Sequence, residues 1–168
     1  MSRSNDVFRH LTEEEKHALV GEMRDELRPL YKELERVAAG TLKLRPVFLG
    51  KQPFPKRCEM IRKAMSLKVN AEEAGDILAA FLMEKYQADV IELLDSLGVE
   101  HEEGGLKDTA PKQPTKKKLT AVVKDFPAGD KATMRGILLR AFAAQSAIDW
   151  PDLDAMLFPE PATTGAKK

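Results

Sequence analysis

The sequence predicts an all-α protein, and three observations support that class. Apolar residues recur at steps of three and four along most of the chain, which is the spacing of a helix buried on one face. Aromatic residues make up only 6% of the chain, a composition that suits helices better than a β-sandwich. The alternation typical of half-buried strands is nearly absent. We expect a kinked N-terminal helix and an extended arm, followed by two pseudo-repeated three-helix units.

The composition is that of a soluble globular protein of one or two small domains. The chain has 168 residues, of which 43% are hydrophobic and 32% are charged. Its single cysteine, Cys58, excludes an internal disulfide and a thiol cluster for metal, and it favours a reducing, cytoplasmic location. The first residues lack an apolar stretch of signal-peptide length, and no run approaches the roughly 18 apolar residues of a membrane span. We therefore expect no membrane partner.

The N-terminal part is expected to form a long kinked helix. After a polar lead-in, Thr12 and Glu15 have the spacing of a capping box, in which side chains and backbone amides satisfy each other. Apolar residues then follow at helical spacing up to Gly40, a typical C-terminal stop. Pro29 lies inside this pattern and has no amide to donate, which predicts a kink near Arg28.

Three prolines interrupt residues 41–55, which complete the N-terminal part, residues 1–55. No helix runs through prolines at this spacing. The segment also carries several large apolar residues, which a polar linker would not. We interpret it as an extended arm packed on the core, with insertion into a groove on a partner as the alternative.

Residues 56–108 are expected to form the first three-helix unit. Asn70 and Asp89 each stand three residues before a glutamate, so both are predicted to cap a helix. Gly98 followed by Val99 predicts a Schellman ending, where glycine takes the left-handed conformation. The predicted buried positions are the following: Cys58, Ile61, Met65, Ala74, Ile77, Leu78, Phe81, Leu82, Val90, Leu93, Leu94 and Leu97.

The same plan recurs about sixty residues later, in residues 116–158, after a proline-containing linker at 109–115. Asp130 and Asp149 stand where the caps of the second unit would fall. The corresponding buried positions are the following: Leu119, Val122, Phe126, Met134, Ile137, Leu138, Ala141, Phe142, Trp150, Leu153 and Leu157. We interpret the match as an internal duplication. Residues 159–168 hold no large apolar side chain and are expected to be disordered.

A stretch before the linker resembles the recognition helix and wing of a winged helix-turn-helix. It runs from Leu93 to Leu106 and reads Leu-Leu-Asp-Ser-Leu-Gly-Val-Glu-His-Glu-Glu-Gly-Gly-Leu. Its charge argues against reading DNA, because the helix that begins near Asp89 carries acidic and no basic residues, and the loop adds further glutamates. Phosphates would repel such an element. We therefore interpret residues 101–105 as an acidic, glycine-bearing loop.

The net charge is zero, but the charges are strongly segregated along the chain. Residues 51–69 hold six basic and one acidic residue, a net charge of +5. Residues 70–108 hold two basic and eleven acidic residues, a net charge of −9, and residues 109–131 carry a net charge of +4. The candidate binding residues are the basic ones that gather on the leading helix of each unit: Lys56, Arg57, Arg62, Lys63, Lys116, Lys117, Lys118 and Lys124.

Two basic helices of this kind are suited to a phosphate backbone or to an acidic protein. The alternative, which we favour, is that they lie against the acidic segment at 70–108, either in the same molecule or in a second copy of the chain. The sequence alone leaves both interpretations open.

The sequence shows no constellation typical of an enzyme. Its three histidines form no His-x-x-x-His pair for a metal, Cys58 lies on the apolar face of its helix, and no glycine-rich phosphate loop is present. We expect no metal, no cofactor and no catalytic residue. The leading hypothesis is a non-enzymatic interaction or scaffold module that binds a protein partner or a second copy of itself. The alternative is a nucleic-acid-associated regulator that binds phosphates through the two basic helices. An enzyme stays open as a third interpretation, because all-helical enzymes can assemble a site from scattered residues.

Overall fold

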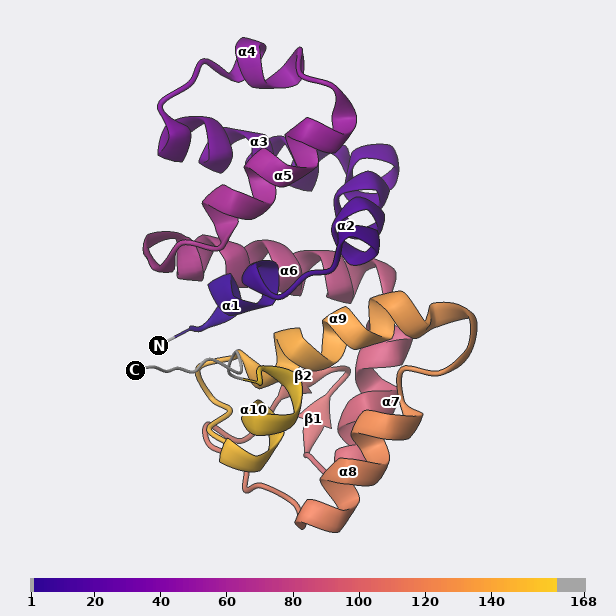
Figure 1. Ribbon diagram of the computed structural model, residues 1–168. Coiled ribbons are helices and arrows are strands. Elements are labelled where there is room, and N and C mark those ends of the chain that lie inside the picture. Colours follow the sequence, from indigo (N-terminus) through magenta and orange to yellow (C-terminus); the bar gives the residue numbers. More distant parts are fainter. Residues whose placement is uncertain (1, 160–168) are drawn as a thin grey trace, which may run out of the picture.

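The computed structural model describes residues 2–159 and confirms the all-α expectation (Figure 1). The strands among these residues are a single antiparallel pair of two residues each. The elements are, in chain order, α1 (Ser4–Arg9), α2 (Glu13–Glu26), α3 (Arg28–Leu42), α4 (Pro46–Gly50), α5 (Phe54–Met65), the 3-10 turn η1 (Lys68–Asn70), α6 (Ala71–Lys85), α7 (Gln87–Leu97), β1 (His101–Glu102), β2 (Gly105–Leu106), α8 (Lys116–Asp125), the 3-10 turn η2 (Gly129–Lys131), α9 (Ala132–Ala143) and α10 (Pro151–Leu157). The tail expected to be disordered lies, apart from Pro159, outside the described residues.

The N-terminal helix is broken where the sequence predicts a kink. Thr12 caps α2, because its hydroxyl accepts the N–H of Glu15 while the Glu15 carboxylate accepts the N–H of Thr12, which confirms the capping box. α2 ends at Glu26 and α3 begins at Arg28, with Pro29 in its first turn. Proline costs little there, since its missing amide would have no partner within the helix. The kink is therefore a complete break between two helices.

The third helix ends later than predicted. We expect Gly40 to stop it, but α3 continues to Leu42 and ends on Lys43, whose φ of 56° lies in the left-handed region. The N–H of Leu44 then closes the turn on the Ala39 carbonyl at 2.8 Å. A lysine therefore makes the turn that the sequence pattern assigns to glycine.

The segment at 41–55, expected to be an extended arm, contains the short helix α4 instead. Its prolines lie at the starts of helices, with Pro46 in the first turn of α4. They mark where a helix begins and do not prevent one from forming. Leu49 is fully buried, whereas Val47 and Phe48 expose 67% and 50% of their surface. Only part of the apolar surface of this segment therefore packs on the core.

The polar lead-in is a helix that joins distant parts of the chain. Val7 and Phe8 of α1 are fully buried, and α1 packs against α5, α6 and α9 (Figure 1). Just before it, Arg3 donates its backbone N–H to the Ala144 carbonyl at 2.9 Å and its guanidinium to the Ala143 carbonyl. Carbonyls at a helix end have no partner within the helix, so the N-terminus of the chain caps α9.

Four of the predicted N-caps are wrong. In the described part of the chain, the residue directly before α6, α7, α9 or α10 makes no side-chain capping hydrogen bond. The N–H of Asp152 in the first turn of α10 is accepted instead by the Gln113 side chain at 3.0 Å. Asn70 lies in η1, and its amide donates to the Ala64 carbonyl and the Thr41 hydroxyl. Asp89 lies in the first turn of α7 and binds Arg135 of α9. The residues that we predict as caps, and that do not cap, are the following: Asn70, Asp89, Asp130 and Asp149.

The end of α7 follows the prediction. Gly98 has a φ of 71°, and its N–H bonds the Asp95 carbonyl at 3.1 Å. The N–H of Val99 bonds the Leu94 carbonyl at 2.9 Å, and the Val99 side chain is buried. This pair of hydrogen bonds confirms the Schellman ending, which turns the chain into the hairpin.

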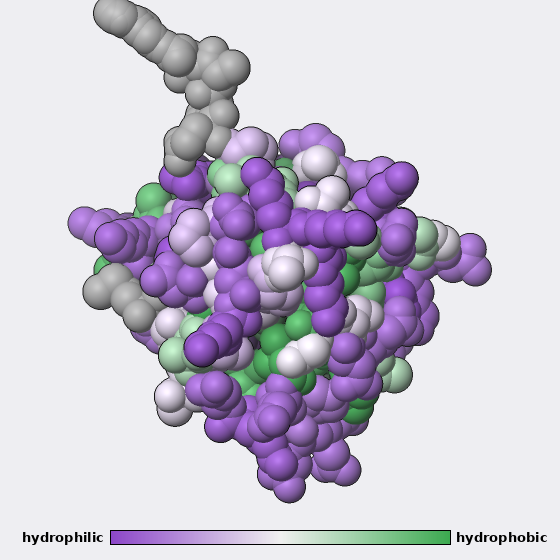
Figure 2. Space-filling model, turned by 90° about the horizontal axis from the view of Figure 1, so that it is seen from below, coloured by the Kyte–Doolittle hydropathy of each residue, from purple (hydrophilic) through white to green (hydrophobic). Residues whose placement is uncertain are grey.

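The predicted apolar stripes lie in one contiguous core. All five stripe positions of α6 and all five of α9 are buried, while Val90, Val122 and Leu157 are only half-buried. α6 packs against α1, α3, α7 and α9, which places it at the centre of the molecule. The face seen from below is mainly hydrophilic, with hydrophobic side chains near its middle (Figure 2). None of the described helices combines the length and the apolarity that crossing a membrane requires.

The helices of the two predicted units follow the same order, which is helix, 3-10 turn, helix and helix, while the first unit also contains the hairpin of β1 and β2. Their surroundings differ, because α5 packs on α1, α2 and α3, whereas α8 packs on α7 and α10. A duplication would produce the common order of elements. The duplication and the unit boundaries stay predictions.

A buried carboxylate is clamped between α7 and α9. Asp89 exposes 3% of its surface and accepts hydrogen bonds from Arg135 at 3.0 Å and from Lys131 at 3.3 Å. The Arg135 guanidinium also donates to both carboxylate oxygens of Glu92, at 2.6 and 3.0 Å, and to the Phe126 carbonyl at 3.2 Å. A buried charge that loses such a partner is left with an uncompensated desolvation cost.

We expect Arg135→Met to lower the free energy of unfolding by about 3 kcal/mol. Asp89 then stays buried, and its single remaining cationic partner is Lys131, which is more exposed than Arg135. Arg36→Met is the matched control. Arg36 binds Glu33 on an exposed helix face, so its loss should cost much less than the loss of Arg135. Urea unfolding followed by circular dichroism measures both changes. Equal losses would show that the clamp contributes no more than a surface ion pair.

Candidate functional site

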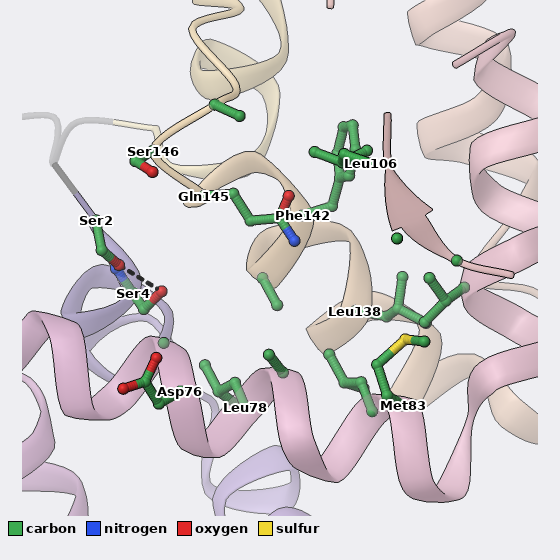
Figure 3. Close-up of a pocket in the computed structure, with 18 of the residues that line it drawn as sticks. Ser2, Ser4, Asp76, Leu78, Met83, Leu106, Leu138, Phe142, Gln145 and Ser146 are labelled. Carbon is green, nitrogen blue, oxygen red and sulfur yellow. Dashed lines mark hydrogen bonds between the residues drawn. The ribbon is translucent and has the colours of Figure 1, made fainter. Parts of the chain in front are cut away.

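An apolar pocket of about 450 Å³ lies between α6, α7, α9 and the β hairpin (Figure 3). Leu78 and Met83 of α6 line one side, Leu106 of β2 lines another, and Leu138 and Phe142 of α9 line a third. Figure 3 shows these side chains around a common space. A volume of this size is typical of sites that hold a small ligand or an anchoring side chain of a partner.

One end of the pocket is polar and is formed by the N-terminus of the chain. The Ser2 hydroxyl donates to the Ser4 hydroxyl at 2.9 Å, as Figure 3 shows, and both lie over Gly75 of α6. A Cβ at Gly75 would come within 3.0 Å of the Ser4 hydroxyl, so a larger residue there would require the serine side chain to shift. The exposed carboxylates of Glu72 and Asp76 stand at the same end and make the rim acidic.

The hairpin forms the opposite wall and is fixed to α7. Its turn places Glu103 and Gly104 at positive φ, 53° and 98°. His101 holds the turn, because its Nδ1 accepts the N–H of Gly104 at 3.1 Å while its Nε2 lies 2.8 Å from the Asp95 carboxylate. A Cβ at Gly104 would come within 3.1 Å of the Met83 terminal methyl. The acidic loop expected here is therefore an ordered hairpin that closes on α6.

The pocket is suited to binding. Its described lining contains no histidine, cysteine or lysine, and two of its serines, Ser2 and Ser4, bond to each other. Among the described residues, no group of three His, Cys, Asp or Glu side chains is placed to hold a metal. The pocket therefore offers apolar contact, a few hydroxyl groups and a negative rim to a ligand.

The pocket and the predicted basic site are different places. Arg57 donates to the Tyr31 hydroxyl at 2.7 Å and to the Gln52 carbonyl at 3.1 Å, and Arg62 binds Glu59 through two nitrogens. The other six predicted side chains are exposed, and within the described chain none of them forms an ion pair: Lys56, Lys63, Lys116, Lys117, Lys118 and Lys124. α5 lies in the upper half of Figure 1 and α8 at its bottom, so the two basic sets do not form one continuous surface.

The acidic segment finds other partners than the basic helices. Asp89 and Glu92 bind Arg135 of α9, and Asp95 lies against His101 of the hairpin. α8 packs beside α7, within the acidic segment, yet its four lysines form no ion pair with described residues. Ion pairs within one molecule therefore do not account for the basic side chains of α8.

A four-membered ion network uses one of the predicted basic residues, Arg62, for structure. The Lys16 side chain, only 3% exposed, binds Glu13 at 2.9 Å and Glu59 at 3.0 Å. The hydrogen bond from Arg62 is the main reason that the pKa of the Glu59 carboxyl is lowered to about 2. Burial opposes this shift, and the hydrogen bond from Lys16 adds to it. Arg62 thus stabilises the contact between α2 and α5.

The single cysteine is a core residue, as the sequence predicts. Cys58 is fully buried, and burial raises the pKa of its thiol to about 11. The reactive thiolate is therefore scarce at neutral pH.

The Glu59 network predicts a pH dependence of stability. The folded pKa lies near 2, below the ordinary value of 4.5, so the ionised carboxylate stabilises the fold above about pH 4.5 and this contribution is lost as the pH falls toward 2. Glu59→Gln should lower the free energy of unfolding at pH 7 by about 1 kcal/mol, since the half-exposed side chain is screened by solvent. The free energy of unfolding of this variant should also fall less steeply as the pH is lowered. Urea titrations at neutral and acidic pH measure the slopes. Glu14→Gln, at an exposed site of α2, should keep the wild-type dependence of the free energy of unfolding on pH. If Glu59→Gln keeps it too, the network of Glu59 is not the source of that dependence.

Comparison with known proteins adds no assignment to this geometry. No family model, no curated protein and no solved structure matches the chain. The pocket, its acidic rim and the basic surfaces are therefore the observations from which a function has to be inferred.

Proposed function

We propose that the protein is a non-enzymatic interaction module whose pocket between α6, α7, α9 and the hairpin receives apolar side chains from a basic helix of a partner protein. The observation that carries the proposal is an open apolar pocket of about 450 Å³ with carboxylates on its rim. A cytoplasmic location is part of the proposal, because the chain has one cysteine and that cysteine is free.

Apolar contact supplies the affinity in this proposal. Met83 exposes 37% of its surface beside the pocket, although most large apolar side chains of the molecule are covered. Methionine adapts to different partner shapes. An amphipathic helix presents apolar anchors at the spacing of successive turns, so one or two of its side chains would fill such a pocket.

Charge selects the kind of helix. Glu72 and Asp76 stand at the rim, and the segment at 70–108 that builds much of the pocket has a net charge of −9. Complementary charge raises association rates and discourages partners of like charge. A basic amphipathic helix therefore fits better than an acidic one. A second copy of this chain, which presents the lysines of α8, is the homo-oligomeric form of the same proposal.

The test uses synthetic amphipathic helices of Leu and Lys or of Leu and Glu. We expect the Lys peptide to bind about ten-fold more tightly than the Glu peptide and to shift the NMR signals of residues that line the pocket. Ala79→Arg places a bulky cation in the pocket from an exposed position of α6 and should remove this binding.

The matched control is Ala80→Arg, which adds the same charge at the next exposed position of α6, outside the pocket lining. It should change the affinity by less than about two-fold. Equal binding of both peptides, or equal loss in both variants, would overturn the proposal. Sedimentation of the free protein identifies the homo-oligomeric form, which Ala79→Arg should dissociate.

A nucleic-acid-associated regulator is the second candidate function. The observation that favours it is the row of exposed lysines on α8, which forms no ion pair among the described residues: Lys116, Lys117, Lys118 and Lys124. Exposed lysines of this kind bind phosphates as point charges, with little dependence on sequence.

Salt decides whether these lysines bind a phosphate backbone. Four phosphate contacts should reduce the affinity for a duplex oligonucleotide about 100-fold between roughly 50 and 200 mM salt. Lys117→Glu with Lys124→Glu should abolish binding, while Lys56→Glu with Lys63→Glu tests whether α5 contributes. Affinity that is insensitive to salt rejects phosphate binding by α8.

A further inference from the structure

A second, polar pocket of about 330 Å³ lies between α3, α4 and α5, apart from the apolar pocket. Four cationic side chains line it together with one carboxylate, that of Glu35: Arg28, Lys32, Arg36 and Arg57. The charge of Arg36 is already matched by Glu33, which it binds through two nitrogens. Three cations therefore face a single carboxylate, which leaves a net charge of +2 for a ligand.

One of these cations is held in a fixed orientation. Arg57 is only 19% exposed in its side chain, and it donates to the Tyr31 hydroxyl at 2.7 Å and to the Gln52 carbonyl at 3.1 Å. Tyr31 is itself buried, with 1% of its surface exposed. Glu35 lies 3.9 Å from the guanidinium, too far for a good hydrogen bond. Part of the Arg57 fork is thus free to bind a ligand in a pre-organised geometry.

The surroundings of this pocket favour anions over cations. Residues 36–58 contain six basic and no acidic residues, and they form the end of α3, all of α4 and the start of α5. Val47 lines the pocket, and Phe48 beside it is half exposed. A ligand here meets positive charge on one side and an apolar edge on the other.

We propose that this pocket binds a terminal phosphate, as in a phosphate monoester or a pyrophosphate. Such a group carries close to two negative charges at neutral pH, which matches the net charge of +2, and its oxygens match the planar fork of arginine. The pocket is larger than a single inorganic phosphate needs, and Val47 offers contact to the organic part of the ligand. This site lies beyond the proposed interaction function and does not depend on it.

Two sources of a terminal phosphate are to be distinguished, a soluble compound and the headgroup of a phosphatidic acid. Isothermal titration with sodium pyrophosphate at low salt tests the first, and sedimentation with vesicles of phosphatidylcholine and phosphatidic acid tests the second. Binding in either arm is expected to weaken about ten-fold in Arg28→Gln with Lys32→Gln, since the double change removes the net charge of +2 from the pocket. Both residues are exposed, and circular dichroism checks that the fold is retained.

Lys43→Gln with Arg45→Gln is the matched control. It removes the same charge from exposed positions at the same end of the molecule, outside the pocket lining, and should change the affinity by less than about two-fold. Arg57→Lys keeps the charge but loses the fork, so it should also weaken binding. Absence of binding in both arms overturns the proposal. So does equal weakening by both double variants, or binding of an oligonucleotide without binding of pyrophosphate or vesicles.

Discussion

Burial of α6 is the constraint on which the rest of this structure depends. Its apolar stripe packs against α1, α3, α7 and α9, so elements from both ends of the chain use it to remove apolar surface from water. α1 completes the arrangement, because Val7 and Phe8 pack in the core while Arg3 caps the end of α9. The apolar pocket lies beside the same helix, and its lining includes two residues of the buried stripe, Leu78 and Leu82, together with exposed residues such as Met83. A helix that forms the centre of a fold thus also forms the floor of its candidate site.

Charge divides the surface into regions of different chemistry. Arg135 of α9 partly neutralises the acidic segment by binding Asp89 and Glu92, while Glu72 and Asp76 of the same segment stand at the apolar pocket. Basic side chains remain at the end formed by α3, α4 and α5, and along α8. A chain without net charge therefore presents a negative rim and two positive regions, because segregation along the sequence becomes segregation in space. Ligands of opposite charge would not compete for one surface.

Local signals in the sequence predicted local structure well. The predictions failed for polar side chains whose partners are distant in the sequence. The capping box at Thr12 and the Schellman turn at Gly98 involve atoms within a few residues, and both are confirmed. Asn70 and Asp89 have the same kind of spacing, yet their side chains bind groups on other helices. Asn70 donates to the Ala64 carbonyl of α5, and Asp89 binds Arg135 of α9. The helix α1 was missed because its six residues are too few to show a periodic pattern, and only tertiary contacts stabilise so short a helix.

The candidate sites were less predictable than the fold, because residues from several separate segments build each of them. The sequence by itself determined the helical class and most buried faces, since burial repeats with the helical period and can be read without knowing the neighbours. Tertiary structure alone decided that Arg57 faces Tyr31 in a pocket while the lysines of α8 stay in solvent. It also decided that Gly75 receives the N-terminal serines. These contacts depend on which helices pack together, and the spacing of residues within one segment does not determine that.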